Sequence, residues 1–260
     1  MQKPQVWPVI HYTSDAIALD NAAMAAEVGA TGVFVISMEG NDAPLVPVAT
    51  LIKKRHPLLK VGVNHLGLPP SGSLAHNLHA RLDATWTDSP GVSSAFISPA
   101  AQAVSQRLRW VPHHLFFASV AFKYQAPEPA PGRAAVMAAT LGMIPTSSGT
   151  ATGVAADLSK LNAMHEDLLE FSNTPAARES NWPRRAPTDL GLASGVTPEN
   201  VVDVIGLVSH ILVATGISAD EHHFDYEKLA LLMGRIAAAP KLPRREGGQR
   251  EAATTGEHPA

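Results

Sequence analysis

The sequence predicts an α/β protein with the (β/α)8 fold of a TIM barrel, built as a single domain. Short β-rich runs alternate with segments of helical periodicity, and eight of each precede residue 240. The β-rich runs lack regularly alternating polar residues, which indicates parallel strands buried on both faces beneath helices. The alternative is an open, doubly wound sheet, but such a sheet usually has about five to seven strands and a crossover at its middle.

The predicted elements follow one another in strict alternation. The strands are expected at residues 6–12, 32–39, 60–66, 84–88, 114–122, 142–148, 189–195 and 210–218. The helices are expected at residues 15–30, 46–56, 73–82, 98–110, 132–141, 155–171, 198–208 and 225–239. Helix starts are indicated by Ser14, Ser71, Ser98 and Thr197, and prolines follow the last two at the first helical position. Trp86, inside the fourth strand, is expected to pack within the barrel.

Two segments do not fit the repeat. Residues 172–188 are polar and proline-rich, and we expect an insertion or contact surface on the face opposite the active site. Residues 240–260 lack apolar periodicity and predict a disordered C-terminal tail. The predicted barrel domain is therefore residues 1–239.

Composition excludes several classes of function. The 260 residues are 45% hydrophobic, carry a formal net charge of −3 and include no cysteine. The chain therefore has no basic surface of the kind that binds nucleic acid, no disulfide and no thiolate metal site. Because it shows neither a signal peptide nor an apolar run long enough to span a bilayer, we expect a soluble, cytoplasmic protein without membrane insertion. A homo-oligomer is possible, since TIM barrels often dimerise.

Small residues follow the last two predicted strands. Ser194, Gly195 and Val196 follow the seventh strand, and Thr215 and Gly216 follow the eighth. Glycine lets the backbone approach an anion closely, and free N–H groups at a helix start favour negative charge. Because phosphate sites in this fold commonly use these two loops, the pair of turns predicts a phosphate site. Ordinary strand-ending turns are the alternative.

Three charged residues near strand ends are candidate catalytic groups. Lys123 could form a Schiff base or neutralise a substrate anion, or it could instead extend into solvent or pair with Asp88 or Glu39. Asp88 and Glu39 could supply a general base. With Asp42 they could alternatively hold a divalent metal, or simply accept hydrogen bonds from loop backbone. No residue pattern supports the metal, and no cofactor motif is evident.

Further polar residues could bind the rest of a substrate. The candidates are His11, Asn64, Thr146, Ser147, Ser148 and Gly149. The last four begin the small-residue loop 146–157, which could wrap a phosphate or ribose or be a flexible connection. That loop is not a Walker motif, because no lysine follows its glycines. The paired histidines at 76 and 79, 113 and 114, and 222 and 223 lack metal-ligand spacing, so surface positions are expected for them.

Six motifs occur in order and at barrel spacing: PVIHY, MEGNDAPL, VGVNHL, FKYQ, TSSGTATG and ASGVTPENV. Over residues 8–235 they resemble the BtpA-like proteins, a branch of the phosphate-binding TIM barrels. The matching positions are Glu39 with Asp42 and Pro44, Gly62 to Asn64, Lys123, Gly149 to Gly153, and Ser194 to Thr197. The chain departs from that pattern at Tyr124, where histidine is expected, and in residues 85–92 and 217–229. The resemblance implies a phosphate-site barrel from a family linked to biogenesis of a photosynthetic membrane complex, without a well-defined reaction.

These observations leave three hypotheses. The first is an isomerase- or lyase-type enzyme that acts on a small phosphorylated metabolite, such as a sugar phosphate or nucleotide-like compound. The second is a non-catalytic assembly or biogenesis factor that keeps the barrel and the phosphate site. The third is a metal-dependent hydrolase or aldolase built on the carboxylates. The first predicts that the Lys123 amine and the Asp88 or Glu39 carboxylate converge beside the turns at Ser194 and Thr215.

Overall fold

The computed structural model describes residues 3–175, 177 and 188–240, and it confirms the predicted barrel. Eight parallel strands pair in chain order, and the barrel closes where β8 pairs with β1 over the register Gln5↔His210 to Pro8↔Val213. A closed sheet of this kind excludes the open, doubly wound alternative. The strands are β1 (Gln5–His11), β2 (Gly32–Ile36), β3 (Lys60–Asn64), β4 (Ala84–Thr87), β5 (Leu115–Ser119), β6 (Ile144–Ser147), β7 (Gly191–Ala193) and β8 (His210–Val213).

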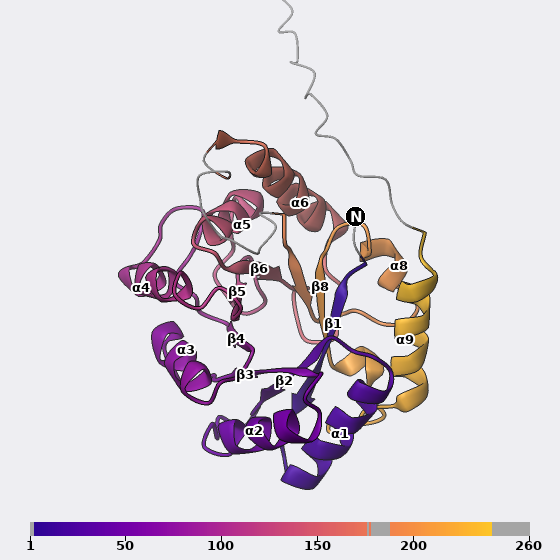
Figure 1. Cartoon of the computed structure of the whole chain (residues 1–260). Coiled ribbons are helices and arrows are strands. Elements are labelled where there is room, and N and C mark those ends of the chain that lie inside the picture. The colour runs from indigo at the N-terminus through magenta and orange to yellow at the C-terminus, as the bar shows by residue number, and fades with distance from the viewer. Residues whose placement is uncertain (1–2, 176, 178–187, 241–260) are drawn as a thin grey trace, which may run out of the picture.

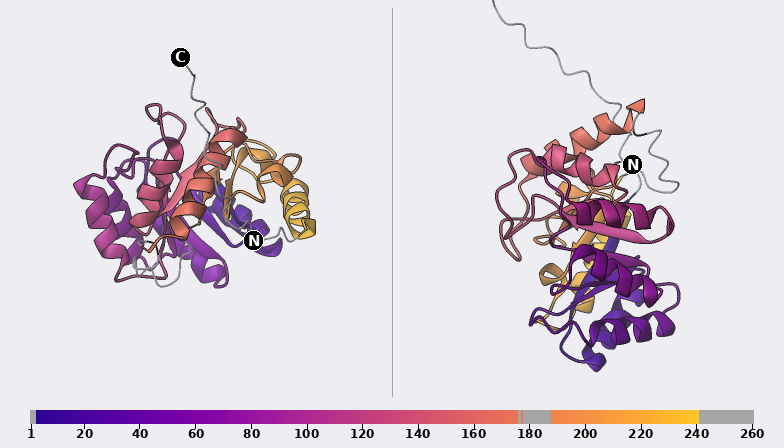
Figure 2. Two further views of the ribbon diagram at one scale, coloured as in Figure 1. Left: turned by 90° about the horizontal axis from the view of Figure 1, so that it is seen from above. Right: turned by 90° about the vertical axis from the view of Figure 1, so that its left-hand side faces the viewer.

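Helices surround the strands on the outside of the barrel (Figure 1), and two further views show the same arrangement (Figure 2). They are α1 (Asp15–Glu27), α2 (Leu45–Arg55), α3 (Pro70–His79), α4 (Pro99–Leu108), α5 (Pro131–Thr140), α6 (Leu158–Ser172), α8 (Val201–Val204) and α9 (Tyr226–Ala238). A 3-10 helix, η1 (Thr215–Ile217), follows β8. The carboxyl ends of all eight strands therefore meet at one mouth.

Aromatic side chains fill the inside of the barrel. The rings of Trp7, Phe34 and Phe117 lie 5.2–5.5 Å apart between centroids. Trp86 contacts Phe34 edge-on at 5.8 Å, which confirms its predicted packing role. Gly62 makes room for this cluster, because a Cβ there would overlap the Phe34 ring. These packed side chains fill the barrel interior below the mouth.

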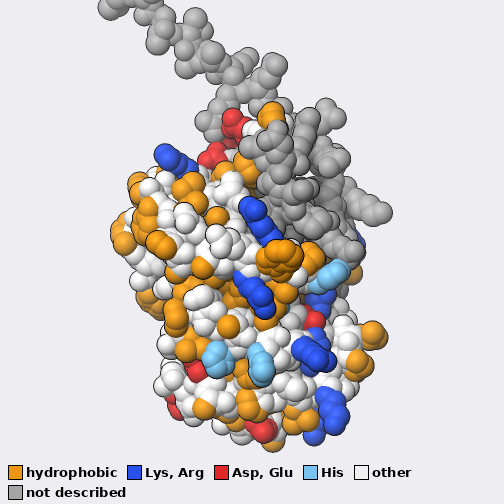
Figure 3. Space-filling model, turned by 60° about the vertical axis from the view of Figure 1, so that its left-hand side comes forward, with side chains coloured by type: hydrophobic (Ala, Val, Ile, Leu, Met, Phe, Trp, Pro, Cys, Tyr) orange, Lys and Arg blue, Asp and Glu red, His pale blue; other side chains and the backbone are white. Residues whose placement is uncertain are grey.

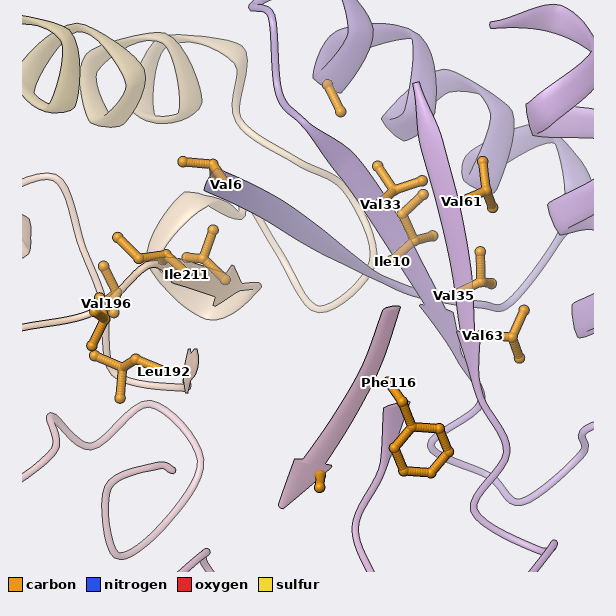
Figure 4. Close-up of a cluster of buried hydrophobic side chains, with 14 of the residues drawn as sticks. Val6, Ile10, Val33, Val35, Val61, Val63, Phe116, Leu192, Val196 and Ile211 are labelled. Carbon is orange, nitrogen blue, oxygen red and sulfur yellow. The ribbon is translucent and has the colours of Figure 1, made fainter. Parts of the chain in front are cut away.

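A second apolar core lies between the strands and the helices. Alternate strand residues such as Val6, Ile10, Val33 and Val35 point outward into this layer (Figure 4) and are buried. Both faces of each strand are therefore covered, which explains why the β-rich runs lack polar alternation.

Several strands end earlier than predicted. β2 stops at Ile36 instead of residue 39, because a turn at Gly40 follows, in which the Ser37 hydroxyl accepts the Asn41 N–H at 3.1 Å. β5 stops at Ser119, and Ala121 then turns the chain with a φ of +48°. β7 and β8 likewise stop at residues 193 and 213. The candidate residues after these strands therefore lie in loops or, for Thr215 and Gly216, in η1.

Helix starts were predicted with mixed success. The hydroxyls of Ser14 and Ser98 cap α1 and α4 as expected, accepting N–H groups at 3.3 and 3.1 Å. The prediction for Ser71 was wrong, because α3 already begins at Pro70. A helix is present within the predicted range 198–208, but its predicted bounds were wrong, because α8 begins at Val201 and has only four residues.

The side chain of Asn200 explains the late start of α8. Its Oδ1 accepts the Thr197 N–H at 2.8 Å, and its Nδ2 donates to the Gly195 carbonyl at 2.8 Å. These two bonds hold residues 195–200 as a compact turn, so Thr197 does not act as a helix cap. The Thr197 hydroxyl instead accepts the Glu199 N–H at 3.2 Å.

Two sequence predictions fall largely outside the described residues. The predicted insertion at 172–188 includes 176 and 178–187, and the predicted tail at 240–260 includes 241–260; none of these positions is described. Among the described residues, no helix has both the length and the apolar character needed to cross a membrane.

Candidate active site at the barrel mouth

Two adjoining hollows open at the carboxyl ends of the strands. The narrow hollow is lined by residues after β5, β7 and β8, among them Lys123, Ser194 and Gly216. The wide hollow has a volume of about 420 Å³ and is lined from β1, β2 and the loop after β8. His11, Thr152 and Thr215 line both hollows. The two spaces therefore form one continuous candidate site.

The five residues predicted to bind phosphate all line the narrow hollow, namely Ser194, Gly195, Val196, Thr215 and Gly216. Ser194 and Gly195 have φ values of +88° and +72°, a left-handed pair that reverses the chain directly after β7. The Val196 side chain is buried in the outer core, so only its backbone can face a ligand.

The turn after β8 lies directly against the turn after β7. A Cβ on Gly216 would overlap the carbonyl of Val196, so glycine is required for this approach. Within the described part of the chain, the backbone N–H groups of Gly195, Val196, Thr215 and Gly216 have no hydrogen-bond partner. Unpaired N–H groups on adjacent turns are the donors that an anion needs.

The loop after β6 folds over the β7 turn. Cβ atoms on Gly149 and Gly195 would each overlap the backbone carbonyl of Val154. The Ser194 hydroxyl donates to the Ala151 carbonyl at 3.2 Å and accepts the Gly153 N–H at 3.1 Å. This loop therefore forms one wall of the narrow hollow.

Lys123 reaches the narrow hollow from a strained loop. Ala121 and Tyr124 on either side of it have φ values of +48° and +62°, which non-glycine residues adopt rarely. The Lys123 N–H donates to the Ser148 hydroxyl at 2.8 Å, and the amine donates to the Thr152 hydroxyl at 3.1 Å. Partial burial lowers the pKa of the Lys123 amine, and the negative charge of Asp88 opposes that shift.

Asp88 lies deeper, just after β4. Its carboxylate accepts a hydrogen bond from the Asn64 amide at 3.1 Å. Burial raises its pKa, while Asn64, the charge of Lys123 and the Ser119 hydroxyl oppose the shift. No ion pair within 4.0 Å joins Asp88 to Lys123 among the described residues, so the predicted alternative of a simple salt bridge does not hold.

Glu39 is separated from this pair. It is exposed, lies three residues beyond the end of β2 and lines the wide hollow, where Lys123 is not among the lining residues. Asp42 accepts the Gly67 N–H at 3.0 Å, which agrees with the alternative that this carboxylate accepts hydrogen bonds from loop backbone. Asp88 is not among the described lining residues of either hollow, although its charge acts on the Lys123 amine, and Glu39 lies at the other end of the mouth.

The predicted substrate-binding residues divide into two groups. His11 lines both hollows. Asn64 is fully buried, and its amide donates to the Asp88 carboxylate. Thr146, Ser147, Ser148 and Gly149 are not among the described residues that line either hollow. The hydroxyls of the first three donate to the backbone carbonyls of Ile144, Ala121 and Gly149.

Sequence reasoning missed four residues that shape the site. Thr152 holds the Lys123 amine, and Asn200 braces the β7 turn. Gln125 donates to the carbonyls of Asp88 and Ser119 at 2.7 and 2.9 Å. Lys160 on α6 donates to the carbonyls of Ala121 and Ser148 at 3.0 and 2.6 Å. Only Thr152 carried a sequence signal, through its place in the small-residue loop.

Histidine placement differs in part from expectation. His76, His79, His113 and His223 are exposed and His222 is partly exposed, but the surface prediction for His114 was wrong. His114 is buried, and its ring bonds the Thr85 hydroxyl at 2.8 Å and the Leu82 carbonyl at 3.1 Å. Among the described residues, no three His, Asp or Glu side chains form a cluster able to hold a metal ion.

The side of the barrel carries a further hollow of about 450 Å³ between α3 and α4. It is lined by Leu74, Leu78 and Val104, with His79 and Arg107 among its polar neighbours. Figure 3 brings this side forward and shows hydrophobic side chains interspersed with Lys, Arg and His. The predicted homo-oligomer stays a prediction.

Comparison with known proteins adds evidence on the fold. No protein-family model matches the chain, and no curated protein does. Phosphoribosyl anthranilate isomerase from Thermus thermophilus superposes with a TM-score of 0.58 at 17% identity, covering 90% of this chain and 98% of that one. 3-Hexulose-6-phosphate synthase superposes with a TM-score of 0.58 at 13% identity, covering 89% of this chain and 99% of that one. KGPDC from Streptococcus mutans superposes with a TM-score of 0.63 at 9% identity, covering 91% of this chain and 98% of that one.

The chain has the TIM-barrel fold of these enzymes. At such low identities the likeness concerns the fold alone, so the BtpA-like resemblance remains a prediction from the motifs.

Proposed function

We propose that this protein is an enzyme of the isomerase or lyase type that acts on a small phosphorylated metabolite, such as a sugar phosphate or a nucleotide-like compound. The observation that carries the proposal is the composition of the narrow hollow. It combines unpaired backbone N–H groups after β7 and β8 with the Lys123 amine, whose charge acts on the partly buried Asp88 carboxylate outside the hollow. The names of the isomerase and the synthase of the same fold, which refer to phosphorylated compounds, support the same substrate class.

The chemistry follows from the two perturbed groups. The phosphate would accept hydrogen bonds from the turns at Gly195 and Gly216, which fixes one end of the substrate. Asp88, with its raised pKa, is suited to remove a proton next to a carbonyl, because a general base works best with a pKa near the working pH. Lys123 can then stabilise the negative charge that develops on the carbonyl oxygen.

Binding is tested first, by isothermal titration with inorganic phosphate and a panel of phosphorylated sugars and nucleotides. We expect Lys123→Met to weaken phosphate binding about tenfold, as loss of one charge-assisted hydrogen bond implies. Lys54→Met is the matched control, because Lys54 is exposed on α2. No binding of any phosphate compound by the wild type would overturn the proposal.

Turnover is tested on the compounds that bind. Incubation in D₂O, followed by NMR, detects deuterium that enters the substrate by proton transfer at carbon. We expect exchange in the wild type and its loss in Asp88→Asn. Tight binding without exchange or turnover would favour the non-catalytic factor, a role that the biogenesis link of the BtpA-like family allows.

A further inference from the structure

The wide hollow differs in chemistry from the narrow one. The narrow hollow offers hydrogen-bond donors, namely the unpaired N–H groups of the two turns and the Lys123 amine. The wide hollow contains no lysine or arginine among its described lining residues, but it includes Glu39, Asp220 and Glu221. One end of the continuous site is therefore rich in donors and the other end is acidic.

His11 lies at the junction of the two hollows and acts there as an acceptor. Its ring lies close to the backbone of Glu221. Burial lowers the pKa of His11, and the charges of Lys123 and His222 add to this shift, so the neutral ring is favoured. A neutral imidazole carries an N–H on one nitrogen and a lone pair on the other. His11 can therefore accept a proton-bearing group of a ligand.

The carboxylates add acceptors of the same kind. Within the described residues, the carboxylates of Glu39 and Glu221 have no hydrogen-bond or ion-pair partner. Asp220 accepts the N–H groups of His222 and His223 at 2.8 Å, which lowers its pKa to about 2 and keeps it charged. A carboxylate accepts hydrogen bonds and repels anions, so this hollow disfavours a second negative group.

Hydrogen bonds from α1 and α9 hold the loop that carries Asp220 and Glu221. Asn21 on α1 donates to the His222 carbonyl at 2.6 Å and accepts the Phe224 N–H at 2.9 Å. Lys228 donates to the Ser218 carbonyl at 2.9 Å on the other side of the same loop. The backbone of this loop is thus anchored on both sides.

We infer that the substrate is a monophosphate whose other end is neutral or cationic and rich in hydrogen-bond donors, such as a polyol or an amine, and that His11, Glu39 and Glu221 select this end. The inference rests on the proposed phosphate site and narrows its substrate class. It excludes bisphosphates and phosphorylated carboxylic acids as preferred ligands.

A matched pair of probes tests the selection. Glycerol 3-phosphate and 3-phosphoglycerate share the phosphate and differ in that a hydroxymethyl group in the first is a carboxylate in the second. We expect isothermal titration to show that the wild type binds glycerol 3-phosphate about tenfold more tightly, and that added salt narrows the difference. In the double variant Glu39→Gln/Glu221→Gln we expect the two affinities to agree within about threefold.

The variant Glu166→Gln is the control, because it removes one exposed carboxylate on α6, away from the mouth. This variant should keep the wild-type difference in affinity between glycerol 3-phosphate and 3-phosphoglycerate. Equal binding of the two probes by the wild type, or discrimination that survives in the double variant, overturns this inference while the phosphate site stands. Failure of both probes and of inorganic phosphate to bind overturns the proposed function and this inference with it.

Discussion

Replacing Gly195 with alanine probes how the loop after β6 packs on the β7 turn. Gly195 has a φ of +72°, and a left-handed conformation costs a residue with a Cβ about 1–2 kcal/mol. The new Cβ would also overlap backbone atoms of Val154 and Ala155, which cannot rotate away as a side chain can. Overpacking of this kind costs about 1–3 kcal/mol, so the expected loss of unfolding free energy is about 2–5 kcal/mol.

Gly29→Ala separates the two contributions. Gly29 has nearly the same φ, +77°, but no described atom lies within 4 Å of the position that its Cβ would take. We therefore expect this variant to lose about 1–2 kcal/mol, from the backbone conformation alone. Urea unfolding followed by far-UV circular dichroism gives both values.

The outcome also bears on binding. If the loop moves to relieve the overlap, the bonds from Ser194 to Ala151 and Gly153 break, and affinity for inorganic phosphate falls. Equal losses of stability in the two variants, together with wild-type phosphate affinity in Gly195→Ala, would refute the packing that the structure shows.

Two more predictions follow from the site. Burial raises the folded-state pKa of Asp88, so the stability that this residue contributes is complete below pH ~4 and is lost as the pH rises through its folded pKa. We expect Asp88→Asn to remove this loss of stability with rising pH, so that a plot of the urea midpoint against pH becomes flatter between pH 4 and 8. An unchanged plot would contradict the assigned pKa shift. Asn200→Asp keeps the acceptor for the Thr197 N–H but loses the donor to the Gly195 carbonyl. It should cost about 1–2 kcal/mol in urea unfolding and weaken phosphate binding, whereas full retention of both would show that the turn does not depend on this bond.

The sequence was most informative where a residue's role depends on its neighbours in the chain. Runs of Val, Ile and Phe, such as those containing Val33 and Phe116, could be recognised as strands because both faces of each strand are buried. Ser14 and Ser98 could be recognised as caps because the N–H groups they accept lie three residues away. Counting strands then placed Ser194 and Thr215 at the seventh and eighth positions, which is why these turns could be proposed together.

Specific side-chain partners were not readable in this way. Asn200 bonds Gly195 only five residues away and converts a predicted helix start into a turn. Other partners are distant in the chain. Thr152 meets Lys123 across 29 positions, and the Asn21 amide holds a carbonyl 201 positions away. No local pattern encodes such partners, because the barrel brings them together only after it closes.

The sequence alone therefore determined the barrel, its strand order and the mouth where the strands end, because periodicity and burial are properties of single segments. Only the tertiary structure decided which candidate residues share a space. It placed Lys123 beside the two turns, with the charge of Asp88 acting on its amine, and left Glu39 at the acidic end. The physical reason is that the strand ends and the long loops converge from eight directions, and their final positions depend on packing and on hydrogen bonds between distant segments.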